Sequence, residues 1–283
     1  MKAKIEVVKT LLDALPYIKK FHNEKIVIKY GGSAQTSEEL KEKFAQDIVL
    51  LQTVGMKPII VHGGGKAITN LLSSLGISTE FIDGQRVTTK EVMRIAEMVL
   101  SGEINKEIVS LLNLHGAKAI GISGKDGSFL EAIPKDFEKF QYTGTIQNIN
   151  SEVVENIIDD GFIPVIAPIA SSAKPNHPGF NINADLVASK VAVALKARKV
   201  IFLTDTQGVL DKSMNLLGRL DVANVDRLKR EGVISGGMIP KVDACIEALR
   251  GGVKKAHIID GRVEHSILLE ILTSSGIGTC IEL

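Results

Sequence analysis

The chain has 283 residues, of which 45% are hydrophobic and 24% charged, and its formal net charge at pH 7 is +1. This composition is that of an ordinary globular protein, with one large α/β domain or two smaller ones. The near-zero charge and the absence of tryptophan argue against a nucleic-acid partner, which would need a basic stripe or aromatic stacking platforms. No apolar run is long enough to span a membrane and no signal peptide is recognisable, so we expect a cytoplasmic protein with no membrane partner.

The chain starts with an amphipathic segment. Residues from Ile5 to Phe21 place apolar side chains at helical spacing, and Pro16 predicts a kink or break near Ala14 or Leu15. No strand precedes this helix, so its apolar face is expected to pack either against another subunit or back onto its own domain.

After this segment, strands and helices alternate. Strands are expected at 25–29, 57–62, 117–122, 163–167, 200–204, 255–259 and 279–282, and helices at 37–53, 65–75, 90–112 (as one or two), 151–160, 184–195, 221–231, 239–249 and 265–272. A projecting β-hairpin is expected from 129–133 and 141–149, and a surface loop at 171–179. Apolar runs such as 59–61 and 200–203 are typical of strands buried on both faces, and they indicate an open, mostly parallel sheet in an αβα sandwich.

Two lysines lie next to glycines at opposite ends of the chain. Lys29 ends the first strand and precedes Gly31 and Gly32, and Lys241 follows a glycine pair. Glycine lets backbone N–H groups approach an anion closely, and lysine adds a positive charge. Each motif alone could be a strand–turn–helix junction with an incidental lysine. Together with a third glycine cluster at 63–65, they favour a polyphosphate site, formed when the chain folds back on itself.

The glycine cluster at 63–65 follows a strand and opens a helix, which is a common position for anion binding. It is not a Walker A loop, because Lys66 is followed by Ala67 and not by Ser or Thr. It is not a dinucleotide fingerprint either, because Ile68 occupies the place of the third glycine. The loop is therefore expected to bind an anion by another arrangement.

Three further polar motifs point to ligand binding. Arg86, on a turn before a helix, could recognise a carboxylate with two hydrogen bonds or could be a solvated loop cation. Asn181 and Asn183 point the same way on an extended stretch, and Asp185 near the helix start could cap the helix or hold lysines in register. Residues 204–210 follow a buried strand, where a ligand crevice is expected in an open α/β sheet.

Taken in order, these motifs resemble the amino-acid kinase family over nearly the whole chain. The motifs around Arg86 and at 181–185 bring the resemblance closest to its N-acetylglutamate kinases, which use ATP to phosphorylate the γ-carboxylate of N-acetyl-L-glutamate in arginine biosynthesis. With the placement of the motifs, the resemblance implies a single domain over 1–283. It would consist of an N-terminal helix at 1–22, a substrate-binding lobe at 23–169 and a nucleotide-binding lobe at 170–283.

The resemblance also implies a role for each motif. Lys29 and Lys241 would stabilise the transferring phosphoryl group, and Asp185 would orient both lysines. The substrate would be bound by Gly64, Gly65, Arg86, Asn181 and Asn183, and the nucleotide by Gly31, Gly32, Thr204, Asp205, Gly208, Val209, Leu210, Gly236 and Met238. ATP would carry Mg²⁺, with no metal ligands expected from the protein. A carboxylate acceptor is already an anion near neutral pH and needs no general base, so His62 is expected to be structural.

Members of this family that are inhibited by L-arginine resemble this chain in two further ways. They carry an N-terminal helix that interlaces dimers into a homohexamer, a trimer of dimers, and a C-terminal pattern matched here by His257, Glu270 and Gly276. Lys199 and Tyr17 are further candidates for the effector pocket. The proline-rich loop at 171–179 departs from the family pattern. The alternatives are a sibling kinase acting on aspartate, glutamate or carbamate, and a non-catalytic arginine sensor.

Overall fold

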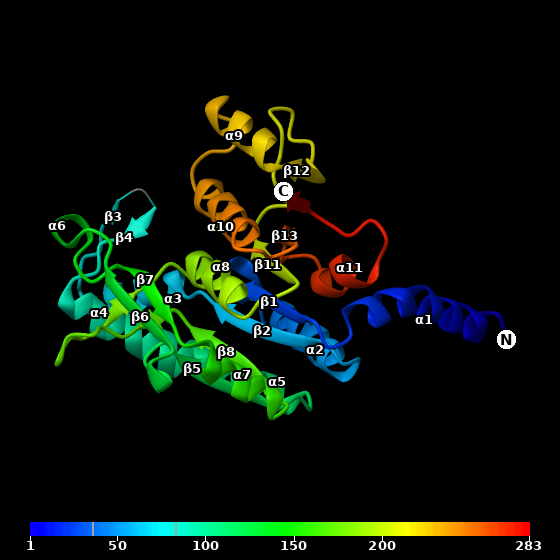
Figure 1. Ribbon diagram of the computed structural model, residues 1–283, viewed down its shortest axis with the longest axis horizontal. Coiled ribbons are helices and arrows are strands. Elements are labelled where there is room, and N and C mark those ends of the chain that lie inside the picture. The colour runs from blue at the N-terminus through cyan, green and yellow to red at the C-terminus, as the bar shows by residue number, and fades with distance from the viewer. Residues whose placement is uncertain (36, 83) are drawn as a thin grey trace.

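A computed structural model describes residues 1–35, 37–82 and 84–283. Its central sheet confirms the predicted α/β architecture, because every pair of neighbouring strands is parallel except β13 and β14 (Figure 1). The strand order is β12 (Arg219–Asp221), β14 (Thr279–Glu282), β13 (Lys255–Asp260), β11 (Lys199–Thr204), β1 (Lys25–Tyr30), β2 (Lys57–His62), β8 (Ile163–Ala167) and β5 (Ala119–Ser123).

The sheet has helices on both faces. The helices of the described residues are α1 (Lys2–Phe21), α2 (Glu38–Thr53), α3 (Gly65–Ser74), α4 (Lys90–Glu97), α5 (Asn105–Leu114), α6 (Phe137–Phe140), α7 (Ser151–Asp159), α8 (Ala184–Ala194), α9 (Val222–Arg230), α10 (Met238–Arg250) and α11 (Ser266–Leu272). A π-helical segment, η2 (Met98–Ile104), joins α4 to α5. The predicted helix at 90–112 is therefore one continuous helix that is π-helical in its middle part. In the described part of the chain, no helix is both long and apolar enough to cross a membrane.

Short strand pairs lie beside the sheet. The predicted hairpin is confirmed as β6 (Leu130–Pro134) and β7 (Gly144–Ile149). Two further pairs were not predicted: β3 (Phe81–Ile82) with β4 (Gln85–Arg86), and β9 (Ile169–Ala170) with β10 (Phe180–Asn181). Two-residue strands are too short to show an alternating pattern of apolar and polar side chains.

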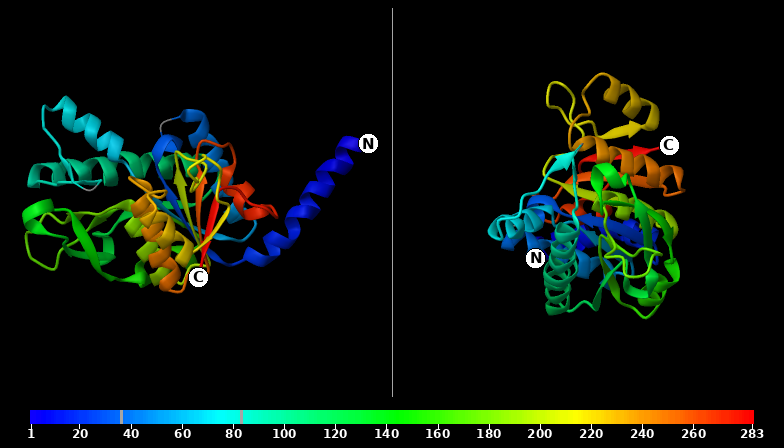
Figure 2. Two further views of the ribbon diagram at one scale, coloured as in Figure 1. Left: turned by 90° about the horizontal axis from the view of Figure 1, so that it is seen from above. Right: turned by 90° about the vertical axis from the view of Figure 1, so that its left-hand side faces the viewer.

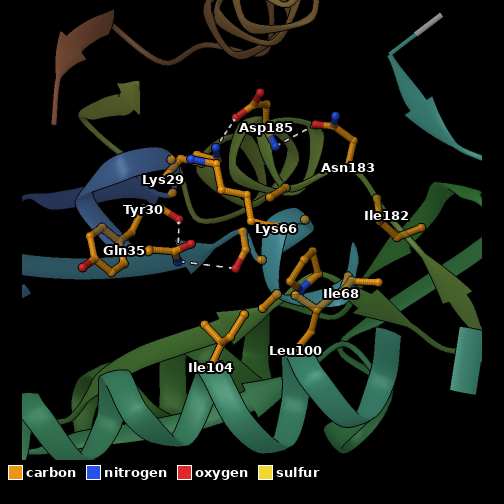
Figure 3. A pocket seen from close by; sticks show the side chains of 18 of the residues that line it. Lys29, Tyr30, Gln35, Lys66, Ile68, Leu100, Ile104, Ile182, Asn183 and Asp185 are labelled. Carbon is orange, nitrogen blue, oxygen red and sulfur yellow. Dashed lines mark hydrogen bonds and ion pairs between the residues drawn. The ribbon is translucent and has the colours of Figure 1, made fainter. Parts of the chain in front are cut away.

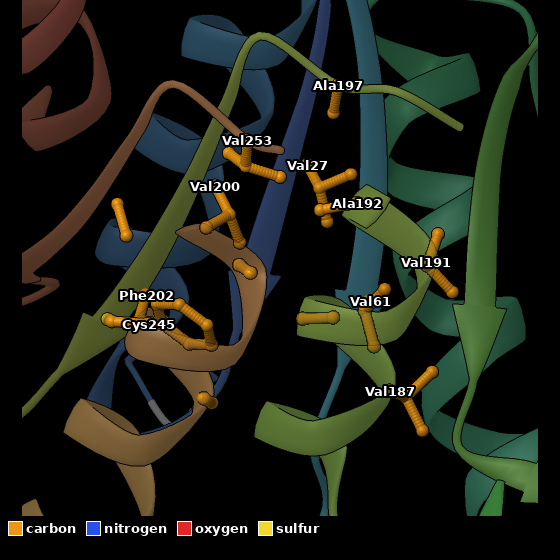
Figure 4. Packing of buried hydrophobic residues seen from close by; sticks show 14 of the residues in the cluster. Val27, Val61, Val187, Val191, Ala192, Ala197, Val200, Phe202, Cys245 and Val253 are labelled. Atoms are coloured by element: carbon orange, nitrogen blue, oxygen red, sulfur yellow. The ribbon is translucent and has the colours of Figure 1, made fainter. Parts of the chain in front are cut away.

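Alternate residues of the central strands supply two separate hydrophobic cores. Val27 and Val61 point to the face covered by α7, α8, α9 and α10, and Figure 4 shows them beside Val187 and Val191 of α8. Ile28 lies in the opposite core, under α2, α3, α5 and α11. This alternation with period two is what a strand buried on both faces requires.

The N-terminal helix has no break at Pro16. A kink or break is expected near Ala14 or Leu15, but α1 continues unbroken through Pro16 to Phe21. A proline removes one backbone N–H and so leaves one carbonyl, that of Leu12, without its helical partner. Leu12 is exposed, so water can hydrogen-bond that carbonyl and the helix can continue.

Helix α1 projects from the body of the molecule, with the N-terminus at its far end (Figure 2). Apolar residues on the projecting part are exposed, including Val7, Val8 and Leu11. At the other end Phe21 is buried in the core, and Tyr17 packs against the same cluster. The helix is therefore attached through its last turns and leaves an apolar face uncovered.

Parallel strands bring their carboxyl ends to one edge of the sheet. At this edge β1 ends before Gly31, β2 before Gly63 and β11 before Asp205. The predicted glycine motifs thus come together although they are far apart in the sequence.

Candidate active site

A buried carboxylate lies between two lysines at the carboxyl edge of the sheet. Lys29 Nζ, from β1, is 3.1 Å from Asp185 Oδ1 in an ion pair. Lys241 Nζ, from α10, donates a hydrogen bond to Asp185 Oδ2 at 2.9 Å. The two lysines, 212 positions apart in the sequence, are held in register by one side chain.

The start of α8 explains why the side chain of Asp185 is available to pair with both lysines. Asn183 is the N-cap of α8, and its Oδ1 accepts hydrogen bonds from the backbone N–H groups of Asp185 (2.8 Å) and Leu186 (3.2 Å). The capping function therefore falls to Asn183, and the carboxylate of Asp185 is left to pair with Lys241 and with Lys29, toward which it points in Figure 3. Burial raises the pKa of Asp185, but the charges of Lys29 and Lys241 outweigh burial and hold that pKa below its usual value.

One cavity of about 550 Å³ adjoins this cluster, within the size range of small-molecule sites. It brings together all the predicted catalytic and substrate-binding residues and part of the predicted nucleotide site. These are Lys29, Gly31, Gly32, Gly64, Gly65, Arg86, Asn181, Asn183, Asp185 and Lys241.

Arg86 connects the β3–β4 hairpin to the glycine loop. Its guanidinium donates to Gly65 O (2.9 Å), to Thr69 Oγ1 (2.8 Å) and to Thr79 Oγ1 (2.7 Å). It also stacks over the Phe81 ring, 4.6 Å from the ring centre. The arginine is buried and lines the cavity, so it is a fixed cation and not a solvated loop residue.

Asn181 lies on the same side of the cavity. Its Nδ2 donates to Thr88 Oγ1 at 3.2 Å, and Thr88 in turn contacts Thr143 Oγ1 at 2.8 Å. These bonds join β10 to the loop after Arg86 and to the residue before β7. The substrate side of the cavity is thus built from three segments that are distant in the sequence.

The rest of the predicted nucleotide site does not line this cavity. Gly32 has φ +72°, and a side chain there would collide with the carboxylate of Asp205 across the gap between the β1 and β11 loops. Val209 N–H donates to Thr279 Oγ1 at 2.8 Å, which ties this loop to β14. Thr204, Asp205, Gly208, Val209 and Leu210 lie at or after the end of β11, and Gly236 and Met238 flank the start of α10.

The predicted effector residues form a second polar cluster away from the cavity. Glu270 Oε1 is 2.7 Å from His257 Nδ1 and 3.4 Å from Lys199 Nζ, and Glu270 Oε2 accepts from Ile277 N–H at 3.0 Å. A side chain at Gly276 would collide with the same carboxylate. Four of the five predicted residues therefore meet at Glu270, and Tyr17 lies on α1, which contacts α11.

Sequence reasoning missed several residues that line the cavity. Leu100 and Ile104 of η2 form part of its wall, and Tyr30, Gln35 and Lys66 also line it (Figure 3). Leu100 and Ile104 belong to no recognisable motif, because apolar side chains on a helix recur with the same spacing whether they line a cavity or face the core. Lys66 follows the glycine loop directly, and this adjacency was the one signal that could have found it.

Comparison with known proteins agrees with this geometry. The model of the amino acid kinase family matches residues 24–260. The chain is 76% identical to an acetylglutamate kinase of a Sulfurovum species over 100% of both chains. It is 69% identical to an acetylglutamate kinase of a Nitratiruptor species, over 99% of this chain and 98% of the relative.

Among solved structures, the chain is similar to an N-acetylglutamate synthase from Neisseria gonorrhoeae complexed with coenzyme A and N-acetyl-glutamate. The TM-score is 0.87 at 25% identity, and the match covers 98% of this chain and 63% of that longer protein. With the lysine–aspartate cluster and the glycine loops in one cavity, these similarities identify an enzyme of the phosphotransferase class. The chain belongs to the amino acid kinase family, within which it groups with the acetylglutamate kinases.

Proposed function

We propose that the enzyme transfers the γ-phosphoryl group of ATP to the γ-carboxylate of N-acetyl-L-glutamate, giving N-acetyl-L-glutamyl 5-phosphate and ADP. The observation that carries this proposal is the Lys29–Asp185–Lys241 cluster, which borders the same cavity as Arg86 and the glycine loop. An arginine suits the α-carboxylate of the acceptor, and two lysines suit a phosphoryl group in transfer. The names of the full-length relatives support the same acceptor.

The chemistry needs charge neutralisation more than proton transfer. The acceptor carboxylate is an anion near pH 7, so no base has to activate it. Its attack on another anion is opposed by electrostatic repulsion. Lys29 and Lys241 would offset this repulsion, and Asp185 would fix their ammonium groups before the substrates arrive, so that little reorganisation is needed during transfer.

The metal would enter with the nucleotide. Among the described residues, no group of three or more His, Cys, Asp or Glu side chains is placed to hold a metal ion, and both oxygens of Asp185 face lysines. We infer that Mg²⁺ binds mainly through the phosphate oxygens of ATP, where it neutralises their charge. Residues 23–169 would form the acceptor lobe and 170–283 the nucleotide lobe. The strands of the first range (β1, β2, β8 and β5) make up one half of the sheet and those of the second (β11, β13, β14 and β12) the other half, and the two halves meet where β1 pairs with β11.

A coupled assay of ADP release tests the acceptor. Purified enzyme with ATP and Mg²⁺ should turn over N-acetyl-L-glutamate far faster than glutamate, aspartate or carbamate. Preference for one of the other acceptors would assign the chain to a sibling activity. Nucleotide binding without turnover of any acceptor would instead favour a non-catalytic sensor.

We also propose that L-arginine inhibits the enzyme by binding near Glu270. This carboxylate is buried, contacts two basic groups and lies beside Gly276, whose backbone it approaches closely. A guanidinium could replace the basic partners of Glu270 with paired hydrogen bonds. Binding would change activity by favouring one subunit arrangement over another.

The uncovered apolar face of α1 supports a hexamer in which this helix joins dimers. Removal of residues 1–22 should then reduce a hexamer to dimers in light scattering, and an arginine titration of the full chain should inhibit turnover. A full-length dimer that ignores millimolar arginine would contradict the regulatory proposal and leave the kinase proposal standing.

A further inference from the structure

His62 is a fully buried residue that ends β2, directly before the glycine loop. Its Nδ1 is 2.9 Å from Gly63 O, and its Nε2 is 3.2 Å from Asn105 Nδ2. It does not line the cavity. The imidazole therefore lies behind the loop and contacts the loop through one carbonyl.

These two contacts fix the tautomer of the ring. A carbonyl oxygen can only accept a hydrogen bond, so Nδ1 carries the proton and donates it to Gly63 O. Nε2 is then the acceptor for the amide of Asn105. That amide donates its second hydrogen to Val165 O at 2.9 Å, so its orientation is fixed by the sheet.

The fixed carbonyl determines where the next N–H points. In a planar trans peptide, the C=O of Gly63 and the N–H of Gly64 point in opposite directions. His62, with a weaker contribution from Gln35 Nε2 at 3.4 Å, fixes the direction of this carbonyl and therefore the direction of the Gly64 N–H. Gly64 lines the cavity, and its N–H has no acceptor within the described residues.

Apolar contacts from η2 hold the same loop from the other side. A side chain added at Gly64 would collide with the ends of Ile104 and Leu100, so the backbone of Gly64 rests directly on this π-helical segment. Asn105, which sets the ring of His62, is the residue that follows η2. The π-helical segment and the histidine therefore act on one peptide unit. Such segments often occur at functional sites.

We propose that His62 is a positioning residue for phosphoryl transfer, which turns the Gly63–Gly64 peptide so that the N–H of Gly64 faces the transferred group. The proposal rests on the kinase function proposed above. A role as a proton carrier does not fit, because burial lowers the pKa of His62 to about 4 and both ring nitrogens are already in hydrogen bonds. The histidine stays neutral and acts through geometry.

Two substitutions of similar size test the hydrogen bonds of the two ring nitrogens separately. In His62→Asn the side-chain amide reaches the place of Nδ1 and can still donate to Gly63 O. In His62→Gln the amide reaches the place of Nε2, keeps a partner for Asn105 and loses the bond to the loop. We expect His62→Gln to lower kcat about 10-fold, a fraction of the ~10²–10³-fold loss seen when a transition-state donor is removed. The KM values should change less, and His62→Asn should recover most of kcat.

His115 supplies the matched control. It is a half-buried histidine at the end of α5 that contacts Leu111 O and Glu42, far from the loop, and the same two substitutions there should leave kcat within about twofold. Equal losses of kcat in both His62 variants, in proportion to their losses of thermal stability, would overturn the proposal. So would a His62→Gln enzyme with normal kcat. Absence of activity in the wild type would contradict the kinase function instead.

Nitrogen NMR of the wild-type protein gives a readout that does not depend on a variant or on turnover. With ¹⁵N-labelled histidine, His62 should be neutral and protonated at Nδ1 at pH 7, and it should remain so at pH 5.5. A proton on Nε2 would overturn the proposal, because Nδ1 could not then donate to the loop carbonyl.

Discussion

Asp185 and Glu270 are both buried carboxylates in contact with two basic side chains, but their surroundings differ. Asp185 and both of its partners line the cavity, and the side chains of Lys29 and Lys241 are 10% and 20% exposed. Glu270 does not line the cavity, and its partners Lys199 and His257 are 9% and 6% exposed. One cluster faces a ligand space and the other is enclosed.

The charge of the two clusters differs as well. Two lysines and one carboxylate leave Asp185's cluster with a net charge of +1, directed at a cavity. Burial lowers the pKa of His257, so this histidine is neutral at pH 7, and Lys199 with Glu270 sums to zero. The first cluster is suited to attract an anion. The second is suited to exchange its own basic partner for another cation, which is how a guanidinium would bind.

The largest expected effect follows from removing a lysine. Lys241→Met should lower kcat by about 10²–10³-fold and change the KM values less, because this charge would matter most during transfer. Lys199→Met, the matched change in the enclosed cluster, should affect kcat without arginine far less. Steady-state kinetics of both variants decides whether the two clusters have separate functions, and similar losses in both would remove the distinction.

A smaller difference is expected in stability when each carboxylate becomes an amide. Asp185→Asn leaves two lysines close together without a counter-charge, and we expect a loss of about 3–5 kcal/mol in the free energy of unfolding. Glu270→Gln leaves one lysine and a neutral histidine, so about 1–3 kcal/mol is expected. Denaturant unfolding at one protein concentration measures both values. A larger loss in Glu270→Gln would show that the enclosed cluster carries the greater uncompensated charge.

The smallest expected effect is on the pH dependence of stability. The folded-state pKa of His257 lies below its ordinary value of 6.5, so the unfolded chain binds more protons below that pH and stability falls as the pH drops from 6.5. The folded-state pKa of Asp185 lies below 3.8, so its stabilisation is lost only under more acidic conditions. Wild type should thus lose more stability than His257→Gln between pH 7.5 and 5. Other buried histidines, such as His62, contribute equally to both proteins and cancel. Parallel curves would contradict the neutral state of His257.

Strands buried on both faces could be predicted from the sequence, because a short continuous apolar run between turn residues is typical of a strand with helices on either side. The predictions for β2, β8 and β14 match the observed residues. Pairing in β3–β4 could not be predicted, since two residues show no period. The break expected at Pro16 was wrong, because water can reach the freed carbonyl of Leu12 on the exposed helix.

Within the site, the charged residues and the glycine loops could be predicted from the sequence, but the partners of the hydrogen bonds could not. The two lysines and Asp185 could be grouped by their chemistry before any geometry was known. The choice between Asn183 and Asp185 as the helix cap depends on a dihedral angle that neither residue type dictates. The second bond of His62 comes from Asn105, 43 positions away, and no local pattern connects the two.

The position of β1 at the centre of the sheet also affects how the chain is made. Its neighbour β2 is synthesised soon after it, but its other neighbour, β11, follows about 170 residues later. At roughly 5–20 residues per second, β1 keeps one open edge for about 10–35 s on the ribosome. An open strand edge can pair with another chain. The strand at the centre of the finished sheet is therefore open to pairing with another chain until the second half of the molecule has been made.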